Sequence, residues 1–320
     1  MPPPGRESLT MSDDSQGMIL SAAIVRKPRH CVKDLISIIV TTYERVDALN
    51  AVLRSLARQT DRNFEVVVAD DGSGPCTAVL VDQWKRRLGA PLVHVWHEHD
   101  GFRAGQIRNR AMLASRGNYF VFLDGDCIVR PDFIATHRGL AEPGWFVSGN
   151  RALLSHAVTD AVLRDGLEPE CWGYRRWLML RLSGGVNRVA PMLRLPLGPV
   201  RKLRARIWRA ARSCNFGAWR SDLERVNGFD AAFSGWGRED SDLIVRLIRS
   251  GVRRKDGEFA TGVLHLWHPK APRARLAEND HLLGQVAAGD RVQAQIGVAS
   301  LRSAGMSSEG GAGGMAVTRT

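Results

Sequence analysis

Two aspartates separated by one glycine, Asp124-Gly125-Asp126, follow an apolar run over residues 119–123 that is typical of a buried strand. Mg²⁺ and Mn²⁺ prefer oxygen ligands and are commonly held by one or two carboxylates together with substrate phosphates. The glycine lets the backbone come close to a bound group. An EF-hand is excluded, because Ile128 stands where a third oxygen ligand belongs. The triplet therefore predicts a site for Mg²⁺ or Mn²⁺. This prediction requires that the fold places the triplet where a ligand can bind.

A second acidic cluster opens a predicted helix directly after the sequence FSGWGR at residues 233–238. Its first positions are occupied by four acidic or hydroxyl side chains, Glu239, Asp240, Ser241 and Asp242. Acidic side chains there could serve only to complement the helix dipole. In the functional interpretation, Trp236 stacks on a sugar or base face and Asp240 acts as a general base. The density of polar groups favours this second interpretation.

The elements that must position these side chains alternate along the chain. Predicted strands cover residues 36–41, 64–69, 92–96 and 119–123, and helical spacing recurs at residues 46–56 and 104–114. This alternation implies parallel βαβ units in a doubly wound sheet, whose ligands bind beyond the carboxyl ends of the strands. Residues 41–43 (TTY) and 70–73 (DDGS) follow the first two strands, so both are expected beside Asp124 and Asp126. Such residues also make ordinary turns, but three clusters at one edge favour a ligand site.

Composition limits the class of protein. The 320 residues carry a formal net charge of +12 and 44% of them are hydrophobic, which is typical of a folded, basic protein. The five cysteines form no C-x-x-C pair, so a disulfide framework and a structural zinc site are disfavoured and reduced cytosolic thiols are expected. The longest early apolar run, residues 18–25, is too short to span a bilayer, and neither a signal peptide nor a transmembrane helix is expected. P-loop, dinucleotide-fingerprint and zincin motifs do not occur.

The basic excess is concentrated in one segment. Residues 174–212 contain eleven Lys or Arg and no Asp or Glu, interleaved with aromatic and aliphatic side chains. A nucleic-acid binder would use such a surface for stacking and phosphate contacts, but no nucleic-acid motif accompanies it. An interfacial segment fits better, with Arg side chains facing anionic lipid and Trp177 and Trp208 as anchors. A packed insertion whose Arg side chains pair with acidic groups elsewhere is the alternative.

Five stretches in this order carry a family resemblance: SIIVTTYERVDALNAVLRSLARQT, VVVADDGS, GFRAGQIRNRAMLASRGNYFVFLDGDCIVRPDF, GFDAAFSGWGREDSDLIVRLIRSG and HLWHP. They resemble the family-2 glycosyltransferases of the GT-A fold over roughly residues 35–270. The C-terminal portion resembles that of galactosyltransferases and chondroitin-type polymerases. The resemblance implies an α/β GT-A fold, a Rossmann-like doubly wound mostly parallel sheet with a C-terminal acceptor-binding region. It also implies inverting transfer of a sugar from a nucleotide diphosphate donor, with UDP the expected nucleotide.

The resemblance assigns roles residue by residue. At the nucleotide it places Thr41, Tyr43 and, at the uracil edge, Asp71. At the metal it places Asp124, Asp126 and His265, with His268 as the alternative histidine. At the acceptor it places Trp236, Glu239 as an orienting carboxylate and Asp240 as the base.

Physical chemistry adds two expectations. Arg103 and Arg108 are expected to assist the diphosphate as charge-assisted hydrogen-bond donors, unless they are solvated surface residues of a helix. An inverting displacement needs the base and the metal on opposite sides of the sugar. Asp240 lies far along the chain from Asp126 and can supply the opposite side.

The expected organisation is a tail at residues 1–33, a nucleotide-sugar-binding half at 34–150, an acceptor-binding half at 151–270 with the basic insertion 174–212, a helical segment at 271–300 and a tail at 301–320. A strand at 214–219 and helices at 221–226 and 239–250 are expected within the acceptor half. The expected protein is cytoplasmic, peripheral on the inner face of the cell membrane, and extends a surface polysaccharide or a lipid-linked glycan. The alternatives are a nucleotide-sugar-binding protein without catalysis and a basic nucleic-acid-binding protein; no nucleic acid is expected as a partner.

Overall fold

The computed structural model describes residues 34–209, 211, 213–269 and 272–308, so the predicted tail at 1–33 lies outside the described residues. Its central sheet contains seven strands, which are in spatial order β3 (Leu92–Trp96), β2 (Phe64–Asp70), β1 (Ile36–Thr42), β4 (Tyr119–Asp124), β8 (Asn215–Trp219), β6 (Trp145–Ser148) and β9 (Arg253–Asp256). Strands β3, β2, β1 and β4 are mutually parallel, and β9 is parallel to β6. Only β8 runs antiparallel to its neighbours in this sheet. The predicted mostly parallel, doubly wound sheet is therefore confirmed.

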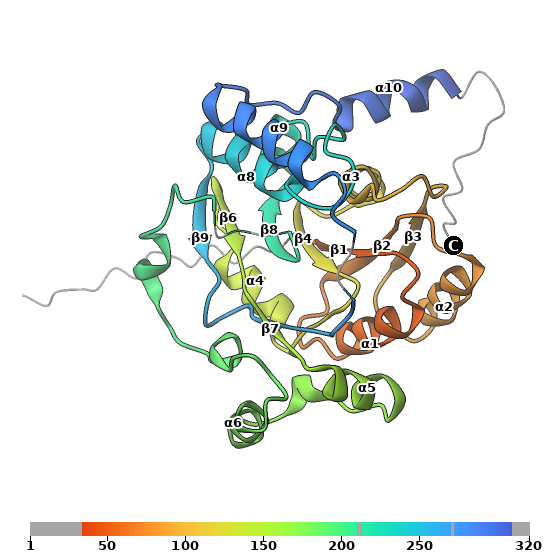
Figure 1. Ribbon diagram of the computed structural model, residues 1–320, viewed down its shortest axis with the longest axis vertical. Helices are drawn as coiled ribbons and strands as arrows, with labels where there is room; N and C mark the ends of the chain where they lie inside the picture. The colour runs from red at the N-terminus through yellow and green to blue at the C-terminus, as the bar shows by residue number, and fades with distance from the viewer. Residues whose placement is uncertain (1–33, 210, 212, 270–271, 309–320) are drawn as a thin grey trace, which may run out of the picture.

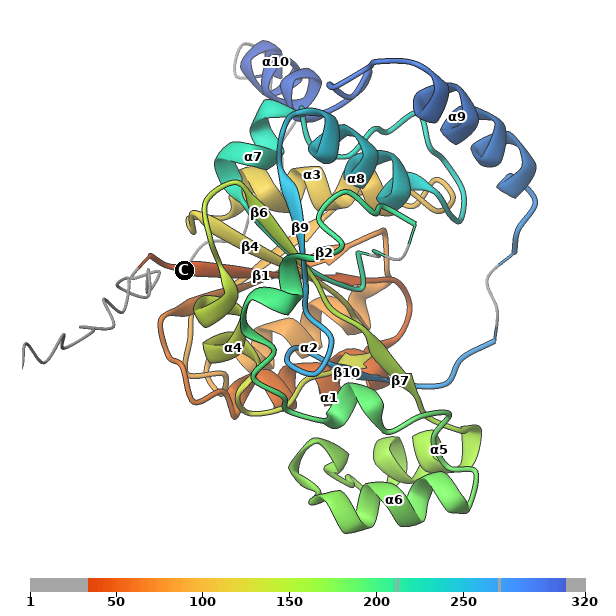
Figure 2. The ribbon, with the colours of Figure 1, turned by 90° about the vertical axis from the view of Figure 1, so that its left-hand side faces the viewer.

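Helices cover both faces of this sheet (Figures 1 and 2). One face carries α1 (Val46–Ala57), α2 (Pro75–Lys85) and α4 (Phe133–Leu140), and the other carries α3 (Ala104–Ala114), α7 (Arg220–Arg225) and α8 (Glu239–Arg249). Successive side chains of a strand point to opposite faces, so Val66 and Val68 join the core under α1 while Val67 and Ala69 join the core under α3. Every residue of β2 is buried, as expected for a parallel strand covered on both sides.

A second, three-stranded sheet lies against the carboxyl end of β4. It consists of β5 (Cys127–Ile128), β10 (Val263–His265) and β7 (Arg151–Leu153), with β10 in the middle. His265 pairs with Cys127 across the antiparallel β5–β10 ladder. This small sheet thus brings residue 265 next to Asp126, although 139 positions separate them in the sequence.

The basic segment is part packed and part exposed. Its helix α6 (Tyr174–Leu182) projects with α5 (His156–Arg164) from the body of the molecule (Figure 2). Trp177 was expected as a membrane anchor, but this expectation is wrong, because Trp177 is 1% exposed and packs in the core that also contains α1. Trp208 is half-buried and packs against the cores under α3 and α9.

After α6 the segment follows the surface through short 3₁₀ turns at Ala190–Met192 and Gly198–Lys202. Here several basic side chains have partners. Arg194 pairs with Asp132 at 2.9 Å and Lys202 with Glu142 at 2.7 Å. The buried Arg201 guanidinium donates to the carbonyl oxygens of residues 195, 256 and 258. The packed-insertion alternative therefore holds for this part of the segment.

The C-terminal region is helical. It contains α9 (Leu276–Ala288) and α10 (Val298–Ser308). Residues 301–308, which the sequence assigned to a tail, form part of α10, so that boundary was wrong. Among the described residues, no helix has the length and apolar character needed to cross a bilayer.

Candidate active site

The Asp-Gly-Asp turn is built against the end of β1. Thr41 is the register partner of Asp124, and the Gly125 amide donates to the Thr41 carbonyl oxygen at 2.7 Å. A Cβ atom at residue 125 would lie 2.9 Å from that oxygen and 3.0 Å from the Cβ of Thr42. Only glycine fits this close approach, and the turn brings the carboxylates of Asp124 and Asp126 within 4.8 Å of each other.

Asp126 faces two histidines. Its Oδ2 lies 3.6 Å from His265 Nε2 and 3.3 Å from His268 Nε2, and the three donor atoms lie within 4.8 Å of one another. A second set combines Asp124, Asp126 and Cys127. The sequence left His265 and His268 as alternatives, and the structure brings both to Asp126.

These residues fit a divalent cation. Carboxylate oxygen suits Mg²⁺ and Mn²⁺, and imidazole suits transition ions, so the set can hold a divalent ion without deciding which one. Burial lowers the pKa of His265, against the attraction of Asp126, and its imidazole is therefore neutral at neutral pH. Neutral imidazole is the form that binds a metal.

Arg108 of α3 lies at the centre of the site. Its three donor positions reach Asp124 Oδ1 at 3.2 Å, Glu239 Oε1 at 3.1 Å and Thr41 Oγ1 at 3.0 Å. Burial alone would lower the pKa of Arg108, but the two carboxylates raise it above its ordinary value. The side chain is a buried bridge, 4% exposed, and the surface alternative is wrong. Its contact with a diphosphate stays a prediction.

Glu239 begins α8 directly above this arginine. One of its oxygens accepts from Arg108, and the other, Oε2, is buried without a hydrogen-bond partner among the described residues. Burial and then repulsion from Asp240 raise the pKa of Glu239 to about 7, while Arg108 opposes the rise. A buried, unpartnered oxygen at the edge of a site is an acceptor available to a ligand hydroxyl.

The loop before α8 has three residues with left-handed backbone, of which only Arg238 is not glycine and is therefore strained. Gly235, Gly237 and Arg238 have φ angles of 76°, 103° and 82°, and the Gly235 amide donates to the Phe102 carbonyl at 3.0 Å. Left-handed conformations of this kind persist at functional sites where surrounding contacts hold them. Asn279 of α9 supplies such contacts, because its amide donates to the carbonyl oxygens of Ser234 and Gly237.

Asp240 and Trp236 are both half-buried in this region. Asp240 Oδ1 accepts from the backbone amide of Ser241 at 2.7 Å, whereas Oδ2 makes no hydrogen bond within the described part of the chain. The guanidinium of Arg273 lies 4.7 Å from the Trp236 ring centroid. Their roles as base and acceptor platform remain predictions.

The nucleotide-side residues lie at the carboxyl ends of β1, β2 and β3. Asp71 is buried, and its two oxygens are bonded to His97 Nε2 at 2.6 Å and to the Arg103 amide at 2.8 Å. Tyr43 is exposed and stacks on His99 with ring centroids 4.4 Å apart. Asp71 can still accept from a base edge, because each carboxylate oxygen accepts more than one hydrogen bond.

His97 and His99 contact Asp71 and Tyr43 in the candidate site, and the sequence reasoning missed both. They follow β3, the one predicted strand of the four for which no carboxyl-end cluster was considered. The same rule about strand ends would have found them. The Arg103 side chain, in contrast, turns away to the Glu98 carbonyl and lies 3.6 Å from Asp100.

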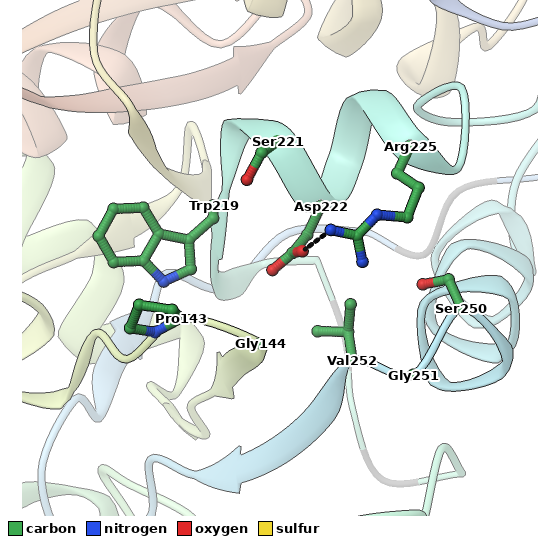
Figure 3. Close-up of a pocket in the computed structure, with 9 residues that line it drawn as sticks. All are labelled: Pro143, Gly144, Trp219, Ser221, Asp222, Arg225, Ser250, Gly251 and Val252. Carbon is green, nitrogen blue, oxygen red and sulfur yellow. Dashed lines mark ion pairs between the residues drawn. The ribbon is translucent and has the colours of Figure 1, made fainter.

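A separate pocket of about 360 Å³ lies at the opposite edge of the sheet, between the end of β8, α7 and the start of β9 (Figure 3). Trp219, Ser221 and Ser250 line it, and Asp222 pairs with Arg225 at 3.2 Å. It contains none of the predicted site residues.

Two models of known families match successive parts of the chain. Residues 37–184 match the model of glycosyl transferase family 2, and residues 202–269 match that of the N-terminal domain of galactosyltransferase. Residues 37–184, a little under half of the chain, are thus similar to glycosyl transferase family 2. Both parts of the resemblance are therefore confirmed.

Two curated relatives illustrate the range of this family. Validoxylamine A glucosyltransferase of Streptomyces hygroscopicus subsp. jinggangensis is 29% identical over 238 residues, which are 68% of this chain and 52% of the relative. Chondroitin synthase of Escherichia coli is 25% identical over 278 residues, 80% of this chain and 38% of the relative. The chain thus spans about half the length of the validoxylamine A enzymes and less of the synthase.

Solved structures of similar fold include S. aureus TarS residues 1–349 in complex with UDP, at a TM-score of 0.53 and 17% identity, covering 83% of this chain and 68% of that one. The mannosyltransferase PcManGT from Pyrobaculum calidifontis, in complex with GDP-Man and Mn²⁺, has a TM-score of 0.50 and 17% identity, covering 88% and 84%. These likenesses show the fold, which is the GT-A fold.

Proposed function

We propose that this protein transfers a sugar, with inversion, from a UDP-linked donor to a hydroxyl of a glycan or lipid-linked acceptor, using Mn²⁺ or Mg²⁺. The observation that carries the proposal is the bridge made by Arg108, which joins Asp124 on the cation side to Glu239 on the acceptor side. Similarity to glycosyl transferase family 2 and the GT-A fold support the same conclusion, as does UDP in the complex of TarS.

The donor would lie across the carboxyl ends of β1, β2 and β4. Tyr43 and His99 form a stacked pair beside which a base can lie, and Asp71 is held by its neighbours at the same edge. A divalent cation held by Asp124, Asp126 and the two histidines would supply Lewis-acid stabilisation of the diphosphate as it leaves.

The acceptor would enter from the side of α8. Asp240 would take the proton of the attacking hydroxyl, which requires an unblocked carboxylate oxygen within hydrogen-bonding reach. Glu239 would accept a hydrogen bond from the acceptor through its unpartnered Oε2. Arg108 would fix the distance between the two halves of the reaction, and such positioning accounts for a large share of many rate enhancements.

A transfer assay on a panel of nucleotide sugars and hydroxyl acceptors tests the proposal. Asp126→Ala should abolish transfer without unfolding the protein, since this side chain lies at a strand end rather than in the core, and EDTA should have the same effect. Full activity of the variant in metal-free buffer would refute the metal assignment. Donor binding with no turnover on any acceptor would favour a nucleotide-sugar-binding protein, and salt-sensitive retention on DNA would favour a nucleic-acid binder.

We also propose that α6 docks the enzyme on an anionic membrane, at the cytoplasmic face where a lipid-linked acceptor would lie. The side chains of Leu178, Met179 and Leu182 are 56%, 64% and 74% exposed. Arg175 and Arg181 of the same helix are exposed as well. Apolar side chains beside cations suit a headgroup region that carries negative charge.

Vesicle co-sedimentation tests this docking. Binding should require anionic vesicles, weaken as salt rises, and fall when Arg175 and Arg181 become Gln and Leu182 becomes Ser. A matched control at α2 and the residues that follow it replaces Val79 by Ser and Arg86 and Arg87 by Gln, all exposed positions. Equal binding of the two variants, or no binding of the wild-type protein at low salt, would contradict the proposal.

A further inference from the structure

Arg151 begins β7 and lies on the face of the small sheet that carries a histidine of the cation cluster. Val263 is its register partner in the parallel β7–β10 pair, two residues before His265. His265 pairs in turn with Cys127 of β5. Directly opposed residues, and residues two apart on a strand, share a face, so Arg151, His265 and Cys127 share one.

Charged and polar groups surround this arginine on that face. Burial alone would lower the pKa of Arg151, but the nearby thiols of Cys127 and Cys214 and the carboxylates of Asp124 and Asp126 raise it. Arg151 in turn contributes to the lowered pKa of His265. The charge of Arg151 is therefore within electrostatic range of both carboxylates and of the histidine, on the face of the small sheet that the register assigns to it.

Arg151 nevertheless has no fixed partner. Within the described ranges its guanidinium makes no hydrogen bond, ion pair or ring contact, whereas each of the three nitrogens of the Arg108 guanidinium donates to a protein group. The backbone around Arg151 is held firmly, because its carbonyl oxygen accepts two hydrogen bonds from Arg188. Arg151 thus has a backbone that is held in place and guanidinium N–H groups that are not in use, on the sheet face that carries His265. Such an arginine can bind an anion.

We propose that Arg151 binds the diphosphate of the donor, contacting the terminal phosphate that becomes the leaving group. The inference rests on the proposed function and adds a residue that the sequence did not single out. Arg108 is paired with Asp124 and Glu239, whereas Arg151 has no ion-pair partner within the described residues, so its positive charge is available to a phosphate. A planar guanidinium is well suited to bind phosphate oxygens through paired hydrogen bonds.

Calorimetric titration of the full chain with UDP, UMP, GDP and GMP in MnCl₂ tests this contact. Arg151→Gln should weaken binding of the diphosphate at least about tenfold, the usual effect of removing a charged hydrogen-bonding group, and change binding of the matching monophosphate less than about twofold. Arg151→Lys should recover part of the affinity. The control Arg164→Gln removes an exposed charge from α5 and should leave both affinities unchanged.

The outcomes separate this inference from the proposed function. If the wild-type protein binds a diphosphate and Arg151→Gln binds it equally well, the inference fails and the proposed function stands. Equal weakening of diphosphate and monophosphate would also overturn it, because the contact would then lie elsewhere. A wild-type protein that binds no nucleotide in the presence of Mn²⁺ would refute both the inference about Arg151 and the proposed function. Thermal unfolding of each variant identifies any general loss of folding.

Discussion

Replacing Glu239 by Gln should make the folded state less sensitive to rising pH. This carboxyl has an ordinary pKa of 4.5, and burial together with Asp240 raises its pKa to about 7 in the folded protein. The folded chain therefore holds a proton that the unfolded chain releases between these two values. The contribution of Glu239 to the free energy of unfolding has its full value below pH 4.5. It is lost as the pH rises towards 7 and beyond.

The size of the effect follows from the gap between the two pKa values. About 2.5 pH units at 1.36 kcal/mol each correspond to a loss of roughly 3 kcal/mol, of which about 2–3 kcal/mol falls between pH 5 and pH 8. The amide of the variant does not titrate and avoids this loss. The Gln side chain contacts Arg108 more weakly than the carboxylate does. This lowers the free energy of unfolding of the variant by an amount that changes little with pH. The variant should thus gain about 2–3 kcal/mol relative to wild type between pH 5 and pH 8.

Urea unfolding followed by tryptophan fluorescence, at about pH 5, 6, 7 and 8, measures this difference. Glu278→Gln is the matched control, because Glu278 is exposed on α9 and outside the site. Its stability should run parallel to that of wild type. A constant difference between wild type and Glu239→Gln over the whole range would refute the reasoning, since it would mean that Glu239 does not titrate between these pH values.

Two further predictions concern the chemistry. Asp240→Asn should lower kcat by about 10² or more, the usual contribution of a general base, with nucleotide affinity unchanged; steady-state kinetics and titration with UDP check this, and a near-normal kcat would show that another group is the base. Gly125→Ala should lower transfer by about 10², because its Cβ would displace the strand end that carries the carboxylates. The same variant should lose about 1–3 kcal/mol of stability in urea unfolding, and normal activity would show that the turn adapts without cost.

Several elements could be predicted from the sequence because their local signals are strong. The runs at β1, β2 and β4 are apolar and β-branched, and their predicted bounds differ from the observed ones by one residue at most. The strand-end rule then brought Thr41, Asp71 and Asp124 to one edge. Helix α8 was found for a similar reason, since its acidic first turn and Gly251 mark its two ends.

Other features depend on contacts that local patterns do not encode. Strand β9 reads as Arg-Arg-Lys-Asp, yet Arg254 and Lys255 are buried, and Lys255 reaches Glu142 at 2.7 Å. Arg108 reads as a surface residue of a helix until Glu239, 131 positions away, is brought against it. The prediction for Trp177 was wrong because the sequence pattern of a basic, aromatic segment is the same whether its tryptophan faces lipid or the protein core. These long-range pairings had to come from the structure.

The position of β8 determines how the molecule can open. This strand pairs with β4 over five residues on one side and with β6 on the other, so it joins the early and late parts of the chain in a single sheet. Separating those parts as hinged lobes would break the middle of the sheet, and a fragment ending near residue 150 would expose the bare edge of β4 to self-association. Any opening around the candidate site would therefore have to come from the loops at the strand ends, because the sheet beneath them is continuous.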